Sequence, residues 1–526
     1  MTANPLEKSE TLSNSDVGDS SANAPRSLEI KADSIAHGVA LMLMLTVVQR
    51  TIGFVRNIAI CRFLEPSELG MWNLAESFLI LAAPLIIFGI PGSFGRYVEH
   101  YRQRGQLRGF LRKTLLATTA IACAGVVLML MFRTTVAKVA FGSDTADEYV
   151  FYTVATLVAV ITYNICGNLL TALRQLRANA GIQFFNSLVF SIAAIALLAT
   201  TALGAKAVLL AYLIACAVTT AGSVFLIRSA ISPLPKSELN LPTSTVWTKL
   251  GPYIGWFWLS DLLMNVFNWI DRLMIVHCAG LNLDDATAMI GQYHSSRIIG
   301  ILMISVSGML GSVLLSYLSH DWEAGRRGEA ESRLDFAIRL VAVAMTAVAV
   351  LTLAFAPVIF GWMLKGNFSE GFEVLHVTLA YCIWYGLLTL AANYIWCHER
   401  PVLACAAAVI GIVVNAALNY ALLPRWGLAG AVSATAIANL TILTSVCVIC
   451  RALGFAMRRG TVIAMLLPGC LCFGAIPALA CMIAVLWHGT TRGWLFSSIE
   501  IGQIRLQLSG YLNLLPNFGM KPVHGT

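Results

Sequence analysis

The chain has 526 residues, of which 58% are hydrophobic and only 12% are charged, about half the charged fraction of an ordinary soluble domain. Apolar runs of about twenty residues recur from Ile35 to Trp487, and each is long enough to cross about 30 Å of hydrocarbon. This composition excludes a soluble enzyme, a nucleic-acid-binding protein and a secreted disulfide scaffold. It predicts an all-α polytopic membrane protein.

The apolar runs predict about thirteen membrane-spanning helices. Their expected ranges are 35–60, 70–90, 110–132, 149–172, 181–201, 206–228, 252–276, 291–318, 336–362, 373–396, 402–423, 429–450 and 461–487. The segments after odd-numbered spans hold few basic residues, namely Arg62, Arg133, Lys138, Lys206, Lys365 and Arg425. The segments after even-numbered spans hold many more, so the positive-inside rule places them, and the N-terminus, in the cytoplasm. We therefore expect a multi-pass protein of the cell inner (cytoplasmic) membrane.

Residues 1–33 are rich in Ser, Asn, Asp and Glu and contain no apolar segment preceded by basic residues. This composition is typical of a disordered tail rather than a signal peptide. Most of the 13 cysteines lie inside apolar runs, where cysteine packs as a small hydrophobic side chain. The pairs Cys447-x-x-Cys450 and Cys470-x-Cys472 are not followed by further ligands at zinc spacing. We predict neither a metal site nor a cofactor.

The chain contains an internal repeat. The region around Arg56 and Gly70 matches a second copy around Arg272 and Gly291, with a longer loop in the second copy. A further match pairs the segments 203–207 (LGAKA) and 426–431 (WGLAGA). Six spans separate the two copies, so both have the same orientation and the repeat is parallel.

The repeat predicts two pseudo-symmetric six-helix lobes that face each other, with about 12 core helices and a probable thirteenth. The expected organisation is a disordered cytoplasmic tail (1–33), an N-lobe with helices 1–6 (34–228), a cytoplasmic linker (229–250), a C-lobe with helices 7–12 (251–455), and an extra helix with a C-terminal tail (456–526).

Four arginines lie in the outer halves of predicted spans. A charged side chain in a span costs at least about 2.5–3.5 kcal/mol, so each one indicates a water-filled cavity or an ion partner. Guanidinium groups bind phosphate oxygens in bidentate geometry and stay charged at low dielectric. A surplus of arginine in a cavity therefore suits a phosphorylated ligand. The candidate residues for binding such a ligand are Arg50, Arg56, Arg272 and Arg297.

Three carboxylates accompany these arginines: Glu76 and Asp271 in the outer half of the membrane and Asp261 nearer the cytoplasm. Glu76 and Arg297 occupy equivalent positions of the repeat. The carboxylates could couple transport to an ion, or they could simply pair with neighbouring arginines. Arg56 and Arg272 could also extend to the membrane interface.

No catalytic motif is present in the sequence. We find no phosphate-binding loop of the form Gly-x-x-x-x-Gly-Lys-Ser/Thr, no His-Glu-x-x-His, no Gly-x-Ser-x-Gly and no extramembrane domain. Transport is therefore the simpler interpretation, and no catalytic residues are assigned. A membrane-embedded glycosyltransferase or polymerase is the alternative from a different class, but such enzymes usually need a sizeable loop.

Three segments resemble a known family. The stretch 88–99 (FGIPGSFGRYVE) looks like the signature after the second helix of Wzx-type polysaccharide flippases, which belong to the multidrug/oligosaccharidyl-lipid/polysaccharide (MOP) exporter superfamily. The stretch 49–56 (QRTIGFVR) resembles the first helix of that family, and 415–435 (NAALNYALLPRWGLAGAVSAT) resembles its eleventh and twelfth helices. The resemblance covers roughly residues 35–455.

This resemblance implies a flippase that moves a polyprenyl-pyrophosphate-linked oligosaccharide across the cytoplasmic membrane by alternating access, for cell-surface polysaccharide biosynthesis. The implied partners are the lipid-linked saccharide, membrane lipids, and glycosyltransferases and a polymerase of the same pathway, with no nucleic acid. Within the same fold, a flippase for the peptidoglycan precursor lipid II or a cation-coupled multidrug exporter remains an alternative. The basic balance of the predicted cavity disfavours the drug exporter.

Overall fold

The structure is a computed structural model that describes residues 35–94, 97–98, 101, 105–144, 146–173, 175–232, 243–497 and 500–502. The predicted tail 1–33, the centre of the predicted linker (233–242) and the end of the C-terminal tail (503–526) lie outside the described residues. The rest of the linker belongs to helices at either side. All regular structure in the described residues is helical, as the composition predicted.

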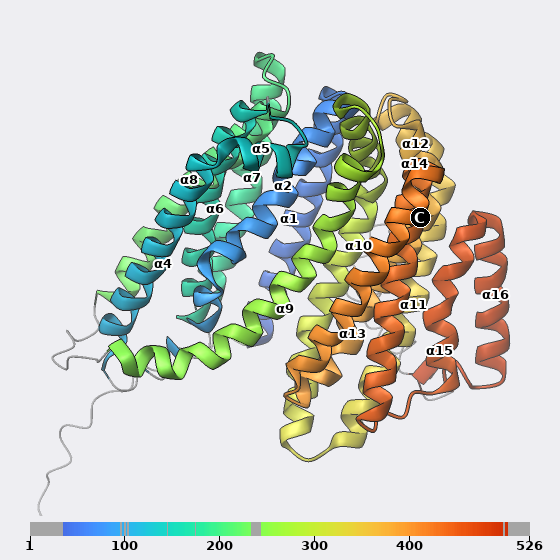
Figure 1. Ribbon diagram of the computed structural model, residues 1–526. Coiled ribbons are helices and arrows are strands. Elements are labelled where there is room, and N and C mark those ends of the chain that lie inside the picture. Colours follow the sequence, from blue (N-terminus) through green and yellow to red (C-terminus); the bar gives the residue numbers. More distant parts are fainter. Residues whose placement is uncertain are drawn as a thin grey trace, which may run out of the picture.

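The first half of the chain forms helices that make up the N-lobe (Figure 1). They are α1 (Ile35–Phe63), α2 (Pro66–Ile87), η1 (Ile90–Ser93), α4 (Leu107–Met131), α5 (Arg133–Phe141), α6 (Asp147–Ala172), α7 (Leu176–Thr200) and α8 (Ala205–Ile231).

The second half forms the C-lobe and a short C-terminal hairpin. Its helices are α9 (Thr243–Cys278), α10 (Leu283–Glu323), α11 (Arg327–Val358), η2 (Ile359–Met363), α12 (Ser369–Glu373), α13 (Leu375–Cys397), α14 (Pro401–Ala452), α15 (Arg459–Leu466), η3 (Leu467–Phe473) and α16 (Ala475–Thr491). Helix α9 begins beneath the N-lobe and rises into the C-lobe (Figure 1).

Within the described residues, nine helices are long and apolar enough to cross a membrane. One of them, α14, contains two crossings, because Gly427 interrupts its helical backbone with φ 55° and ψ −132°. The chain turns back there, and a Cβ on Gly430 would lie only 2.4 Å from the carbonyl oxygen of Leu422. The eleventh and twelfth predicted helices therefore form an antiparallel hairpin around a glycine that must adopt a left-handed conformation.

The internal repeat is visible in the backbone and in the contacts. Gly204, which matches Gly427 in the sequence, has φ 55° and ψ −130°, close to the angles of Gly427. In the N-lobe, Glu68 accepts a hydrogen bond from the Ala205 N–H at 2.6 Å, directly after Gly204. In the C-lobe, Met289 occupies the equivalent position and lies against Gly427. The two lobes thus share the same backbone turn, although the side chains at the equivalent positions beside it differ.

The lobes contact each other where α2 and α10 cross. A Cβ on Gly70 would lie 1.8 Å from the carbonyl oxygen of Thr287, and a Cβ on Gly291 would lie 1.9 Å from that of Pro66. Thr287 precedes Gly291 by four residues, and Pro66 precedes Gly70 by four, so the contact is reciprocal. The equivalent glycines of the repeat therefore allow the two backbones to touch, at the end of the molecule predicted to face outward.

A second contact between the lobes lies at the other end of α2. The indole N–H of Trp258, on α9, donates to the carbonyl oxygen of Pro84 at 3.0 Å. The same indole packs on the ring of Phe88 at 5.3 Å between centroids, and its Cβ would be 3.0 Å from a Cβ on Gly89. Helix α2 is thus held to the C-lobe near both of its ends.

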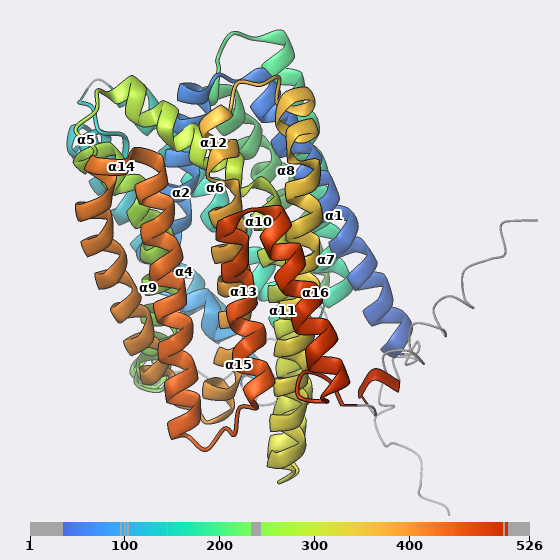
Figure 2. The ribbon, with the colours of Figure 1, turned by 90° about the vertical axis from the view of Figure 1, so that its right-hand side faces the viewer.

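The extra helix predicted at 461–487 is in fact two shorter helical segments. Gly474, with φ 101°, separates α15 and η3 from α16. The two segments lie alongside each other in opposite directions. Two contacts show this: Sγ of Cys470 lies 2.9 Å from Sγ of Cys481, and Gly460 at the start of α15 contacts Trp494 beyond α16. The prediction of a single extra helix was wrong because glycine after a short apolar run marks a turn inside a hydrophobic stretch. Figure 2 shows this hairpin on the outside of the C-lobe.

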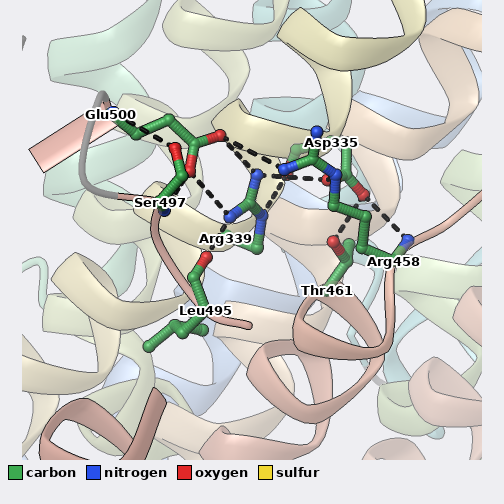
Figure 3. Close-up of polar contacts among 7 residues, drawn as sticks. All are labelled: Asp335, Arg339, Arg458, Thr461, Leu495, Ser497 and Glu500. Carbon is green, nitrogen blue, oxygen red and sulfur yellow. Dashed lines mark hydrogen bonds and ion pairs between the residues drawn. The ribbon is translucent and has the colours of Figure 1, made fainter. Parts of the chain in front are cut away.

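A buried ion cluster holds the end of the hairpin to α11 (Figure 3). The Arg339 guanidinium contacts Asp335 at 3.2 Å and Glu500 at 2.9 Å, and it also donates to the carbonyl oxygen of Leu495. Arg458, at the start of α15, reaches both carboxylates, at 3.7 and 3.6 Å. Burial raises the pKa of Glu500, but hydrogen bonds from Arg339 and Ser497 outweigh this effect and leave that pKa below its ordinary value. The carboxylate therefore remains charged and paired at neutral pH.

We expect Gly291→Ala to separate α2 from α10, because the new Cβ would meet a backbone oxygen that cannot yield. The measurement is the reactivity of a cysteine introduced at Thr287 toward a water-soluble maleimide, which should increase several-fold. Gly308→Ala on the same helix is the matched control, since a Cβ there meets nothing within 4 Å. Equal reactivity in the two variants would contradict the close contact.

Arg339→Leu should lower the free energy of unfolding by about 3 kcal/mol, because it removes the buried cation and leaves Asp335 and Glu500 with only the half-exposed Arg458 as a partner. Thermal unfolding in detergent measures this loss. Arg333, on the same helix, pairs with Asp321 but is 49% exposed, so Arg333→Leu should cost no more than about 1 kcal/mol. A similar small loss in both variants would show that the cluster contributes little to stability.

Candidate functional site

A basic cavity of about 280 Å³ opens between α1, α2, α7, α8 and α10. Two of the four predicted arginines, Arg50 and Arg56, line it together with Glu76. Neutral polar groups and apolar side chains complete the wall. They are Gln49, Gly53, Phe54, Asn57, Asn186, Ser187, Phe190, Tyr212, His294, Ile298, Ile301, Leu302 and Ser305. The cavity includes residues of α10, so both lobes contribute to it.

Arg56 is held by an aromatic ring rather than by an acid. Its guanidinium carbon lies 4.1 Å from the ring centroid of Phe190, and its Nε is buried without a hydrogen-bond partner among the described residues. A guanidinium stacked in this way keeps its N–H donors free for a ligand in the cavity. Glu76 contributes an electrostatic interaction at longer range.

The aromatic support of Arg56 extends further into the N-lobe. Phe190 packs on Tyr212 at 4.9 Å and on Trp72 at 6.0 Å between ring centroids. None of these three residues was a candidate predicted from the sequence. Trp72 stands in the repeat segment that follows Gly70, and Tyr212 is a polar aromatic residue in an otherwise apolar helix, but neither feature alone distinguishes a cavity wall from packing.

A second cavity of about 460 Å³, which we term the amide cavity, adjoins the basic cavity. Glu76 and Tyr212 line both. The amide cavity also contains Asp261, the third predicted carboxylate, which accepts a hydrogen bond from Asn265 at 3.3 Å. Its other liners are Leu79, Ile80, Ala83, Pro84, Ile87, Gly89, Pro91, Gly92, Val160, Asn164 and Asn168.

Arg272 lies in the contact between the lobes and lines neither of these cavities. Its Nε donates to Oδ1 of Asn73 at 3.2 Å, and its guanidinium lies over the ring of Tyr293 at 5.2 Å. Asn73 in turn donates from Nδ2 to Nδ1 of His294 at 2.8 Å. The amide of Asn73, on α2, therefore binds two C-lobe residues at once, one turn from the glycine crossing.

Arg297 also lies outside the linings of the two cavities, one helical turn from His294, which lines the basic cavity. Its guanidinium lies 5.4 Å from the ring centroid of Tyr293, and its Nε is buried without a partner in the described part of the chain. Electrostatic interactions reach both Asp271 and Glu76. Arg297 thus stands between the two carboxylates without pairing directly to either.

Asp271 is bound by neutral donors inside the C-lobe. It accepts hydrogen bonds from Tyr293 at 3.1 Å, from Asn419 at 3.0 Å and from Thr435 at 2.8 Å. Asn415 lies next to it, bonded to Asn419 at 2.9 Å. Asn415, Asn419 and Thr435 belong to the α14 hairpin segment singled out in the sequence. A carboxylate buried in this way is stabilised by hydrogen bonds instead of by a cation.

The pairing of arginines with acids considered above is not present in the described residues. No ion pair within 4.0 Å joins any of the four arginines to Glu76, Asp261 or Asp271 there. The same residues contain no group of three or more His, Cys, Asp or Glu side chains that could hold a metal ion. Arg56, Arg272 and Asp271 are therefore held by aromatic rings, amides and hydroxyls.

Two helical lobes related by a repeat, with charged cavities between apolar helices, define a multi-pass membrane protein with an architecture that is common among transporters. The chain belongs to the polysaccharide biosynthesis protein family, whose model matches residues 35–322. This result confirms the resemblance seen in the sequence. No curated protein matches the chain.

Solved structures with the same fold come from the MOP superfamily. The lipid II flippase MurJ in an inward closed conformation superposes with a TM-score of 0.64 at 15% identity, covering 85% of this chain and 97% of that one. An inward-facing multidrug resistance MATE family transporter gives 0.60 at 13% identity, covering 77% and 95%. A MOP superfamily transporter from Pyrococcus furiosus, described as having a binding pocket of reverse polarity, gives 0.58 at 13% identity, covering 78% and 95%. At these identities the likeness establishes the fold alone.

Asn73→Leu should weaken the contact between the lobes, because it removes the acceptor of Arg272 and the donor to His294. A buried group left unpaired costs about 1–3 kcal/mol, so we expect a clear drop in the midpoint of thermal unfolding. Asn179→Leu is the control, since its single bond to Thr171 lies at the surface. If the two variants unfold at the same temperature, the amide bridge does not stabilise this conformation.

Proposed function

We propose that this protein is a flippase that translocates a polyprenyl-pyrophosphate-linked oligosaccharide across the cytoplasmic membrane, for cell-surface polysaccharide biosynthesis. The observation that carries the proposal is the basic cavity, in which Arg50 and Arg56 have no acidic partner within 4.0 Å in the described chain. Unpaired guanidinium groups at membrane depth need an anionic ligand or water, and a pyrophosphate supplies the bidentate oxygens that they bind best.

The four arginines have different roles in this proposal. Arg50 and Arg56 contact the pyrophosphate in the basic cavity. Arg297, one helical turn from His294, joins them when the lobes move. Arg272 fixes Asn73 and so couples the contact between the lobes to the cavity. The lipid tail remains in the bilayer, and the saccharide crosses through the cavities.

Alternating access follows from the two contacts that α2 makes with the C-lobe. Release at the Gly70–Gly291 crossing opens one end of the cavities, and release at Trp258 opens the other. An inside-negative membrane potential favours outward movement of an anion by about 2.3 kcal/mol per charge per 100 mV. Glu76, Asp261 and Asp271 are the candidate carboxylates for coupling to an ion, in addition to this electrical term.

The proposed setting is the inner membrane with the N-terminus in the cytoplasm, where glycosyltransferases supply the lipid-linked saccharide and a polymerase uses it outside. As the substrate, lipid II would present the same pyrophosphate to the same arginines. The lipid II flippase MurJ has this fold. A multidrug exporter for organic cations is disfavoured by the guanidinium groups of the basic cavity. A glycosyltransferase or polymerase is the candidate from another class.

Proteoliposomes that contain the purified protein and a lipid-linked saccharide in one leaflet test the proposal. Arrival of the lipid in the other leaflet with unchanged mass supports a flippase, whereas a product of altered mass supports an enzyme. Comparing lipid II with a lipid-linked polysaccharide repeat unit in the same assay decides between the two flippase candidates.

Arg56→Ala and Arg272→Ala should each reduce translocation about tenfold or more, because a hydrogen bond to a charged group contributes about 1.5–3 kcal/mol. Membrane insertion should be retained, and Lys at either position should be milder, although lysine lacks the bidentate fork. Arg425→Ala, at an exposed turn of α14, is the control. Normal translocation in Arg56→Ala would refute pyrophosphate binding by Arg56, and normal translocation in Arg272→Ala would refute the coupling through Asn73.

A further inference from the structure

The amide cavity differs chemically from the basic cavity beside it. Glu76 and Tyr212 line both cavities. The rest of the polar lining of the amide cavity consists of two pairs of residues, each spaced by four along a helix: Asn164 and Asn168 on α6, and Asp261 and Asn265 on α9. The first pair belongs to the N-lobe and the second to the C-lobe. No arginine or lysine among the described residues lines this cavity, so the described part of its wall lacks the groups that bind phosphate best.

These polar groups have unused hydrogen-bonding capacity. Asn164 and Asn168 are exposed and form no hydrogen bond with any described residue, and Asp261 receives a single bond, from Asn265. A carboxamide offers two N–H donors and two acceptor lone pairs, and a carboxylate offers acceptors only. Polar side chains on membrane helices that lack protein partners require water or a polar ligand.

We infer that the amide cavity binds the saccharide, specifically the sugar unit attached directly to the pyrophosphate. This inference rests on the proposed function. Sugar hydroxyls both donate and accept hydrogen bonds, which matches a lining of carboxamides and one carboxylate. The volume of about 460 Å³ is within the range of pockets that hold small ligands.

The arrangement of the two cavities matches the order of groups in such a substrate. Glu76 and Tyr212 line both cavities, so a pyrophosphate at Arg50 and Arg56 places its first sugar on the far side of these two residues. In this position Asp261 accepts hydrogen bonds from sugar hydroxyls. A sugar held by α6 and α9 also bridges the two lobes. The contacts that select the sugar therefore also link the N-lobe to the C-lobe.

The test compares binding of two probes to the purified protein: a polyprenyl pyrophosphate, and the same lipid carrying a single N-acetylhexosamine. The wild-type protein should bind the glycosylated lipid about tenfold more tightly, since two or more additional hydrogen bonds are formed. The double variant Asn164→Leu/Asn168→Leu should lose this advantage and retain its affinity for the bare pyrophosphate. Asp261→Asn should lose part of it, and Asn179→Leu, outside both cavities, should keep it.

Arg56→Ala separates this inference from the proposed function, because it should weaken both probes by the same factor. If the sugar gives no advantage to the wild-type protein, or if the double variant retains the advantage, the amide cavity is not the saccharide site and the flippase proposal still stands. If the wild-type protein binds neither probe, the proposed function fails and the inference fails with it.

Discussion

The structure depends on the close approach of two backbones at Gly70 and Gly291, because this contact fixes how the lobes face each other. Each glycine leaves room for a carbonyl oxygen of the other helix. One turn further along, the equivalent residues Asn73 and His294 form a hydrogen bond across the same boundary. The following turn brings Glu76 to the cavities. Equivalent residues of the two repeat copies therefore contact each other. The close contact at the two glycines fixes the positions of the charged groups on the following turns.

The charged side chains near the two cavities are stabilised without ion pairs to other described residues. Arg56 stacks on Phe190, Arg272 binds an amide, and Asp271 accepts three neutral hydrogen bonds. Aromatic rings and amides stabilise a charged side chain without neutralising it, so the side chain can still attract a ligand of opposite charge. The buried cluster around Arg339 illustrates the opposite arrangement, since its charges neutralise one another and serve to attach the C-terminal hairpin. This difference distinguishes the candidate binding site from an ion cluster that attaches one part of the structure to another.

The spans, the parallel repeat and the positions of Arg50, Arg56 and Glu76 could be predicted from the sequence, because hydropathy and charge in a lipid phase leave few alternatives. Other features depend on tertiary contacts. Nothing local to Arg272 reveals that Asn73 will accept its hydrogen bond, and nothing local to Phe190 reveals that it will support Arg56. The turn at Gly474 was hidden because two short helices and one long one have the same average hydropathy.

The turn at Gly474 also determines on which face of the bilayer the chain emerges after its last helices. An uninterrupted thirteenth crossing would carry Glu500 to the face opposite the start of α1, whereas the hairpin returns it beside the first turns of α11, where Arg339 binds it. A fluorescent or enzymatic reporter fused after residue 502 should consequently share a compartment with one fused before α1. Soluble proteins of a single compartment can then bind both ends of the helical region.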